Sequence, residues 1–401
     1  MSKVIVVYIG CLLIAIHTQI RAQSTTIVMA DSLAGVGNYS KAIKAYKTLP
    51  ALSPLTALKI ARAYKALGNS SAALDYYSQC VASNPDWVIA TTEYAKLLIN
   101  QRQFTLADSI FRQLTRRYPN NPDFYYQHGR ILKTVGPQQY IDKGDTLVVR
   151  AKDAFAKAVS LDSTHQKAMY QLGLTYLKKQ QYDKVEQLGN TALKTDATNV
   201  EILSLLAISY YTKGWNSEAI FYFEKLIALG QSTPYIHTRL ARAYAKQGDY
   251  EKSIAQFAKV IQEEDKDPGI HLELARVYQR SGDYLKGIRH SEIALVLQSQ
   301  PIDDTYYTLA TLFKLNKEFQ KAVTHYQLAL QENPERIDAH YGIAVAADNY
   351  YKDKKEVLVL YEEFVAAFKD QTDVRNSYYV RLAQQRIDIL TKEIFMAGTK
   401  D

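Results

Sequence analysis

The stretch from Pro234 to Asp267, PYIHTRLARAYAKQGDYEKSIAQFAKVIQEEDKD, predicts two amphipathic helices joined by a tight turn at Gly248. Apolar residues share one face of each predicted helix, at Leu240, Ala241 and Tyr244 and then at Tyr250, Ile254, Phe257 and Val260. Neither helix can bury this face alone. The pair must therefore pack against similar units before and after it.

The same unit recurs along the chain. A small residue near the middle of each first helix returns at intervals close to 34 residues, at Ala30, Ala61, Ala95, Gly129, Gly173, Ala207, Ala241, Ala275, Ala310 and Ala344. A large residue follows three positions later in most units, as in Tyr244, and we expect these side chains to form the core. A second small-residue series, which includes Ala151 and Ala219, marks the second helices. This period indicates an α-solenoid of paired helices.

The spacing, the small residue, the following aromatic residue, the Gly-Asp-Tyr turn at Gly248 and closing sequences such as QENP before Glu335 resemble tetratricopeptide repeats. The resemblance covers residues 25–370. It implies an all-α fold, a right-handed α-solenoid of about ten helix-turn-helix repeats, whose first helices line a concave groove that binds peptides or protein segments. The chain departs from the pattern at Lys317, where glycine is usual, and in the stretched tenth unit from Ile337.

We expect three regions: a signal peptide at 1–22, the solenoid at 23–370, and a capping helix with a tail at 371–401. The interval between Gly129 and Gly173 is ten residues longer than usual, which places an insertion at residues 134–150. This insertion is either a longer loop with an extended second helix capped by Asp145, or a finger that contacts a partner.

The N-terminal segment begins with Lys3, continues as an apolar run from Val4 to Ile16, and ends in Ala22. This layout predicts a cleavable export signal, and hence a periplasmic or secreted protein of bacterial type without a transmembrane segment after cleavage. The alternative is an uncleaved anchor or an apolar terminus without a targeting role. The apolar run continues past Cys11, which does not favour a lipoprotein anchor.

The composition is that of a folded protein: 47% of the 401 residues are hydrophobic and 22% are charged. The net charge of +8 is a mild basic bias, which fits acidic partners. The basic residues are not concentrated on one face, as binding of nucleic acid normally requires. Cleavage of the signal would remove Cys11 and leave Cys80, which we interpret as a small buried apolar residue.

The sequence contains none of the motifs that would indicate an enzyme, such as a phosphate-binding glycine loop, a CxxC pair, HExxH or Gly-x-Ser-x-Gly. His237, His271 and His340 each precede a small residue by four positions, and we assign them to the core, because no cysteine or acid completes a metal site. We therefore expect no catalytic, cofactor or metal site.

The residue after each small residue faces the groove in the resembled family. Here that series has basic ends and an apolar middle, and neighbouring positions extend it. The candidate partner-binding residues are Arg62, Lys96, Arg130, Leu174, Ile208, Tyr211, Arg239, Arg242, Lys246, Arg276 and Arg280. The hypothesis is a groove that holds a segment with acidic ends and an apolar centre, with arginines bonding carboxylates. The alternative is a solvated face whose charges keep the protein soluble.

These observations predict a non-catalytic scaffold that binds a protein or peptide partner, without nucleic acid and with a possible peripheral place at the cell envelope. Two other functions stay open. One is an envelope-assembly subunit that binds through its convex face or its insertion. The other is a module that binds cell-wall glycans through tyrosine and arginine side chains.

Overall fold

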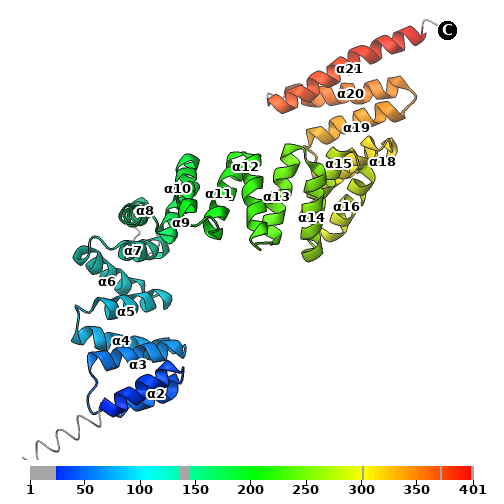
Figure 1. Ribbon diagram of the computed structural model, residues 1–401. Coiled ribbons are helices and arrows are strands. Elements are labelled where there is room, and N and C mark those ends of the chain that lie inside the picture. Colours follow the sequence, from blue (N-terminus) through cyan, green and yellow to red (C-terminus); the bar gives the residue numbers. More distant parts are fainter. Residues whose placement is uncertain (1–23, 136–143, 300–301, 371–372, 399–401) are drawn as a thin grey trace, which may run out of the picture. The chain divides into compact units, whose positions relative to one another are not determined.

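The computed structural model describes residues 24–135, 144–299, 302–370 and 373–398. In these ranges the chain folds into helices joined by short turns, with no strand (Figure 1). The predicted all-α solenoid is confirmed. The first helices of the repeats are residues 24–35, α3 (Pro54–Ala66), α5 (Val88–Asn100), α7 (Pro122–Val135), α9 (Gln166–Lys178), α11 (Val200–Lys213), α13 (Pro234–Gln247), α15 (Pro268–Ser281), α17 (Asp303–Leu315) and α19 (Ile337–Tyr350).

Each first helix is followed by a second helix of the same repeat. These are α2 (Tyr39–Lys47), α4 (Ser70–Ser83), α6 (Phe104–Arg117), α8 (Gly144–Leu161), α10 (Tyr182–Thr195), α12 (Asn216–Ala228), α14 (Tyr250–Glu263), α16 (Tyr284–Leu297), α18 (Phe319–Glu332) and α20 (Lys354–Phe368). The helix α21 (Val374–Gly398) follows the last pair.

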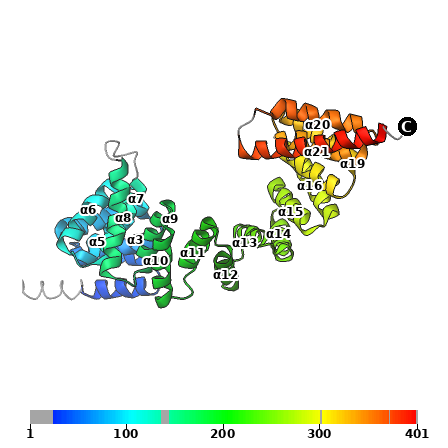
Figure 2. The ribbon, with the colours of Figure 1, turned by 90° about the horizontal axis from the view of Figure 1, so that it is seen from above.

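The chain divides into two compact units, Met1–Ala197 and Thr198–Asp401. Within each unit, every helix from α2 onward packs against the next one along the chain, so that the repeats stack one upon another (Figure 2). This is the arrangement expected when each pair covers its apolar face with its neighbours.

The regions predicted at the ends and at the insertion are described in part. Residues 1–22, the predicted signal peptide, lie outside the described residues. Of the insertion at 134–150, residues 136–143 also lie outside them, whereas α8 begins at Gly144 and makes the second half of the insertion helical. At the other end, Ala383 and Leu390 of α21 are buried against Tyr361 of α20.

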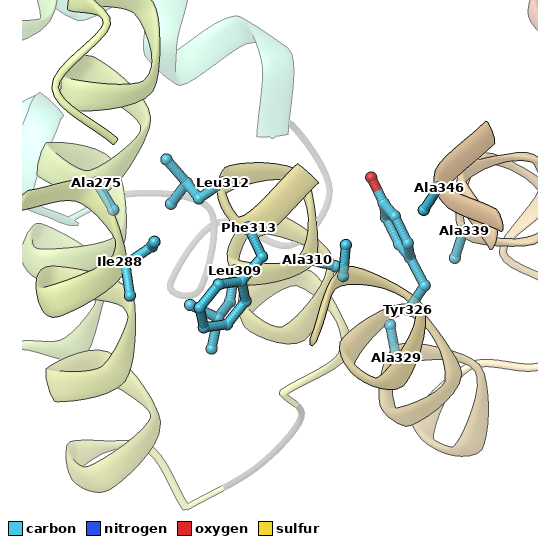
Figure 3. Packing of buried hydrophobic residues seen from close by; sticks show 11 residues of the cluster. Ala275, Ile288, Leu309, Ala310, Leu312, Phe313, Tyr326, Ala329, Ala339 and Ala346 are labelled. Carbon is cyan, nitrogen blue, oxygen red and sulfur yellow. The ribbon is translucent and has the colours of Figure 1, made fainter. Parts of the chain in front are cut away.

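The core follows the small and large residues of the repeat. The small residues from Ala30 to Ala310 that are alanines are fully buried, and large aromatic side chains such as Phe257 and Tyr326 fill the space around them. Figure 3 shows one such cluster, in which Ala310 lies between Phe313 of its own helix and Tyr326 of α18. The small side chain lets the helices approach, and the burial of the aromatic rings stabilises the crossing.

A second contact recurs within single repeats. The residue three positions after the small residue of the first helix contacts the corresponding residue of the second helix, with ring centroids 4.9–5.7 Å apart; the rings are stacked in the first three pairs and tilted in the last. The pairs are Tyr64 with Tyr76, Tyr210 with Tyr222, Tyr278 with His290, and Phe313 with His325. The fourth repeat has Leu132 and Ala154 at these positions instead.

The turn at Lys317 shows why glycine is usual there. Gly248 and Gly282 adopt φ angles of 86° and 87°, and Lys317 adopts 65° at the corresponding turn. Arg102 and Gln180 do the same in their repeats, with φ angles of 60° and 55°. The repeat therefore imposes a left-handed turn even where a side chain makes it costly, by about 1–2 kcal/mol per residue.

We predict that Gly342→Ala destabilises the protein. A Cβ atom at Gly342 would lie 2.6 Å from Cζ of Tyr326, a ring that is 1% exposed and whose hydroxyl lies 3.1 Å from Oγ1 of Thr311. Because this ring has little room to move, the free energy of unfolding should fall by about 1–3 kcal/mol. Urea unfolding measures the change.

Gly35→Ala is the matched control. A Cβ atom at Gly35 would meet no other atom within 4 Å, and this glycine ends the helix at 24–35. The control should leave stability unchanged or raise it, by up to about 1 kcal/mol. Equal effects of the two substitutions would contradict the close contact at Gly342.

Candidate functional site

The basic residues predicted for the groove form a periodic series of ion pairs between repeats. Arg62 binds Glu93 through two bonds of 2.9 and 2.6 Å, and Arg242 binds Glu273 in the same way at 2.6 and 2.5 Å. Lys96 contacts Asp123 at 2.8 Å, and Arg276 contacts Asp304. In each case the cation follows the small residue of one first helix and the acid belongs to the next first helix.

The ion pair between Arg62 and Glu93 determines the charge state of this acid. Burial raises the pKa of Glu93, but the bonds from Arg62 and from the hydroxyl of Tyr77 outweigh it and hold this pKa below its ordinary value. The carboxylate of Glu93 is therefore ionised near neutral pH, and Arg62, which faces it, is already bound to a partner within the chain.

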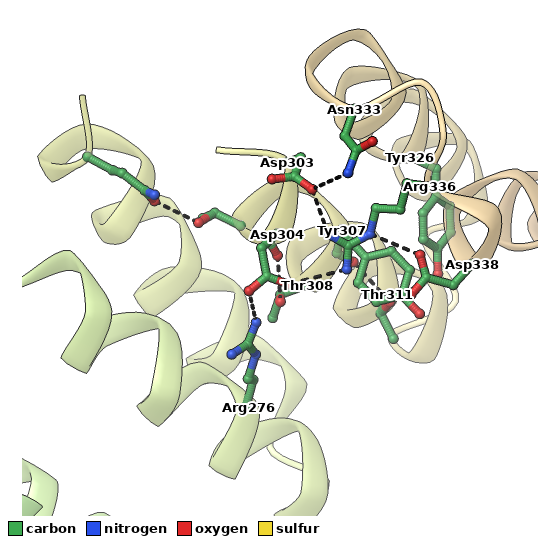
Figure 4. Close-up of polar contacts among 12 residues, drawn as sticks. Arg276, Asp303, Asp304, Tyr307, Thr308, Thr311, Tyr326, Asn333, Arg336 and Asp338 are labelled. Carbon is green, nitrogen blue, oxygen red and sulfur yellow. Dashed lines mark hydrogen bonds and ion pairs between the residues drawn. The ribbon is translucent and has the colours of Figure 1, made fainter. Parts of the chain in front are cut away.

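The series ends in a network in the second unit (Figure 4). Asp304 accepts from Arg276 and also from Arg336 at 3.2 Å. Arg336, whose side chain is 17% exposed, further bonds Asp303 and Asp338 at 2.9 Å each, and its guanidinium lies 4.2 Å from the ring centroid of Tyr307. The network joins α15 to α17 and to the start of α19, so Arg276 has a structural role.

A pocket of about 210 Å³ opens between the first helices of the second unit. Tyr211, Ala245, Phe257 and Val277 give it an apolar lining, and Arg242, Lys246, Glu273, Arg276 and Arg280 supply its charges. We call it the Tyr211 pocket. Its four cations outnumber its single carboxylate, so the pocket is electropositive.

Two of these cations are available to a ligand. Lys246 and Arg280 are exposed, and neither forms an ion pair with any residue that the structure describes. The ring of Tyr211 lies beside Lys246, whose Nζ is 4.8 Å from the ring centroid, and beside the guanidinium of Arg239, at 5.0 Å. These contacts hold Lys246 and Arg239 beside the aromatic ring of Tyr211.

The predicted residues thus fall into two groups. Tyr211, Arg242, Lys246, Arg276 and Arg280 line one pocket, and Arg239 contacts it through Tyr211. In the same unit, Ile208 is half-buried on α11 and does not line the pocket. The other predicted residues lie in the first unit: Arg62 and Lys96 are ion-paired, Arg130 donates to Gln127 at 2.9 Å, and Leu174 is half-buried.

The sequence analysis did not identify the acidic residues that form ion pairs with the predicted cations. Glu93 and Glu273 each precede a small residue by two positions, and Asp123 and Asp304 each precede one by six. The recurrence of these positions is the only sequence signal for the pairing, and it does not give the distance between the helices. The pairing changes the assignment of roles, because the free donors are Lys246, Arg280 and Arg239 instead of Arg242 and Arg276.

His237 and His271 are buried, as predicted, and each contacts the second helix of its own repeat, whereas His340 is half-buried. His237 contacts Gln256 of α14 at 2.7 Å, and His271 contacts His290 of α16 at 3.0 Å, both through Nδ1. Nε2 of His271 lies 3.1 Å from the carbonyl of Asp265, which can only accept, so this nitrogen carries the proton. His290 therefore donates to Nδ1 of His271 when both rings are neutral.

This pair predicts a loss of stability in acid. Burial, then the charges of His271 and Arg289, lowers the pKa of His290 from 6.5 to about 4. The unfolded chain then binds a proton more readily than the folded one, so stability falls as the pH drops through this window. Replacing His290 by Gln should reduce the loss between pH 7 and pH 5 by roughly 1 kcal/mol, allowing for partial exposure.

Urea unfolding at the two pH values tests this expectation. His325→Gln, at the equivalent position of the next repeat, reports the cost of removing a stacked ring. An unchanged pH dependence in the His290 variant would contradict the assignment of the neutral pair.

Comparisons with known proteins identify the repeat. Residues 58–122 and 204–269 match the model of a family described as tetratricopeptide repeat. Among solved structures, yeast Tom70 is 14% identical, covers 94% of this chain and 99% of its own, and has a TM-score of 0.37. The C-terminal part of a TPR repeat-containing protein from Cytophaga hutchinsonii is 20% identical, covers 63% and 98%, and has a TM-score of 0.49.

A third structure, pilF from Pseudomonas aeruginosa, is 16% identical, covers 54% of this chain and 94% of its own, and has a TM-score of 0.39. In the described part of this chain, no helix has the length and apolar character needed to cross a bilayer. The family match falls on the repeats whose helix pairs, small residues and turns are described above. The chain therefore contains tetratricopeptide repeats at residues 58–122 and 204–269, and this repeat typically serves in scaffolds for protein–protein interactions.

Proposed function

We propose that this chain is a non-catalytic scaffold that binds a protein segment along its first helices, and that the Tyr211 pocket is a main contact point in the second unit. The observation that carries the proposal is that Lys246 and Arg280, which form no ion pair with a described residue, lie at the rim of a pocket with an apolar lining. A segment with acidic residues on either side of an apolar one fits this arrangement.

The size of the pocket supports the same ligand. A volume of about 210 Å³ holds one apolar side chain, and its contact with Tyr211, Phe257 and Val277 would contribute most of the burial. Carboxylates on the flanking residues would then face Lys246 and Arg280. Because those cations are exposed, they would contribute mainly to orientation and to the rate of association.

The ion pairs within the pocket make binding sensitive to Glu273. This acid holds Arg242 through two bonds, and it is the one carboxylate among the lining residues. Replacing it by Gln would free the guanidinium and remove a charge that repels an acidic segment. The effect on affinity distinguishes direct binding from a general effect of net charge.

The test uses a fluorescent, end-blocked peptide with the sequence EEEFLEEE and measures its binding by anisotropy at low salt. Reversing both free cations, in the double variant Lys246→Glu and Arg280→Glu, should weaken binding at least about tenfold, or 1.4 kcal/mol. Glu273→Gln should tighten it several-fold, because Arg242 becomes available.

Lys259→Glu is the matched control, because Lys259 is exposed on α14, lies outside the pocket and forms no ion pair with a described residue. It should change affinity only slightly. Equal losses for the control and the double variant would contradict the pocket, and so would binding of the basic peptide KKKFLKKK as tightly as the acidic one.

We further propose that the chain is exported to the periplasm or the cell exterior after cleavage behind Ala22. The basic start, the short apolar run and the small residue before the cut support it. Mass spectrometry of the protein from its native cells should find Gln23 as the first residue. A mature chain that still begins at Met1 would overturn the proposal.

Of the two other functions, glycan binding has a structural feature in its favour. Tyr235 is exposed and its ring centroid lies 5.2 Å from the guanidinium of Arg239, which is a surface that could stack a sugar. A rise in unfolding temperature on adding cell-wall fragments, without any effect of the acidic peptide, would favour this function over the scaffold.

A further inference from the structure

The third and fourth repeats meet at a second pocket, of about 370 Å³, which lies between α6, α7 and α8. Tyr125, Leu132 and Ala154 line its interior, and Arg112 and Lys157 contribute cations to its wall. We call it the Ala154 pocket. It is separate from the Tyr211 pocket, and the proposed function does not use it.

The pocket exists because one recurring contact is missing. In eight of the nine other repeats the position of Ala154 carries a large side chain, and only the first repeat also has an alanine there, Ala45. The large residues are Tyr76, Ile110, Leu188, Tyr222, Gln256, His290, His325 and Leu360. Tyr76 and Tyr222 stack on the residue that corresponds to Leu132. Alanine leaves this space open.

A second contact of the repeat is replaced at the same place. At several other junctions these positions hold two aliphatic residues, one on a second helix and one on the next first helix, such as Ile288 and Leu309, which share one buried cluster. Here the two positions hold Asp108 and His128. Their side chains are 8% and 17% exposed, and Nε2 of His128 lies 2.9 Å from Oδ1 of Asp108.

Asp108 also accepts from Arg112 of its own helix. Burial raises the pKa of Asp108, but the contacts with His128 and Arg112 prevail and lower it overall. The buried carboxylate is thus ionised and anchors one nitrogen of the guanidinium at the pocket wall. The other nitrogens of Arg112 make no hydrogen bond with a described residue, so they can donate to a ligand.

The groups around this cation favour a carboxylate. Lys157 lies one helical turn beyond Asp153 on α8, and both are exposed lining residues. The Thr115 hydroxyl donates to the Arg112 carbonyl at 3.0 Å and is occupied. Asp108 is already bonded to Arg112 and His128. A ligand in the pocket therefore meets two cations, Arg112 and Lys157, and one carboxylate, Asp153, next to an apolar interior.

We propose that the Ala154 pocket binds a small organic carboxylate with an apolar or aromatic body, about the size of one amino-acid side chain. The body lies against Leu132, Ala154 and the ring of Tyr125. The carboxylate accepts from Arg112 and Lys157. A pair of aliphatic residues would serve the packing of the repeats equally well, so the buried carboxylate of Asp108 and the pocket beside it point to a ligand.

The test measures binding of 3-phenylpropionate to the full chain by calorimetry, with 3-phenylpropanol and 3-phenylpropylamine as neutral and cationic counterparts of the same shape. The carboxylate should bind at least about tenfold more tightly than either counterpart. Equal binding of the three compounds, or no binding of the carboxylate, overturns the proposal.

Two variants locate the ligand. Ala154→Leu places in the fourth repeat a side chain like Leu188 of the next one, so it should fill the pocket, abolish binding and leave the unfolding temperature unchanged or higher. Lys157→Gln changes an exposed side chain and should weaken binding of the carboxylate several-fold without affecting the alcohol. Full binding by Ala154→Leu would place the ligand elsewhere and overturn the assignment.

Discussion

The fold depends on the close crossing of helices at one small residue in each repeat. Ala241, Ala275 and Ala310 are fully buried because nothing larger would fit between the crossing helices. At Gly342 the helices are also too close for a larger residue, since a single added carbon would meet the ring of Tyr326. Every other regular feature, from the stacked aromatic pairs to the left-handed turns, follows from bringing two helices this close together at a fixed interval.

The stacking of repeats also decides which charges can act on a partner. A cation that follows a small residue lies within reach of the next first helix, and an acid there captures it. Arg62 and Arg242 are held in this way by two bonds each, and Arg276 is joined to the network around Arg336. The pairing keeps successive first helices in register and leaves Lys246 and Arg280 as the exposed cations of the Tyr211 pocket.

The junction of the third and fourth repeats departs from these rules in two ways. Ala154 replaces the large residue that most second helices carry, and Asp108 of the third repeat meets His128 of the fourth where several junctions have two aliphatic residues. The fourth repeat also carries the insertion at 134–150. Buried charges cost more than apolar residues of the same size. Such a departure in an otherwise regular array is where a function beyond packing is most reasonably sought.

The sequence by itself determined the helical repeat, its period, the core residues and the positions of the turns, including the unusual one at Lys317. These features depend on contacts between residues that are three or four apart, or one repeat apart, and such contacts are visible as periodicity. The sequence also brought Tyr211, Arg242, Lys246, Arg276 and Arg280 into one predicted set, because they occupy similar positions on three successive first helices, α11, α13 and α15.

Only the tertiary structure decided which of those side chains are free. Whether Arg242 meets a ligand or Glu273 depends on a distance between two helices, and no spacing along the chain specifies it. The same holds for the Ala154 pocket, because a missing side chain becomes a cavity only when no neighbour moves in to fill it. Periodicity fixes what each repeat contains, whereas the packing of one repeat on the next fixes what remains exposed.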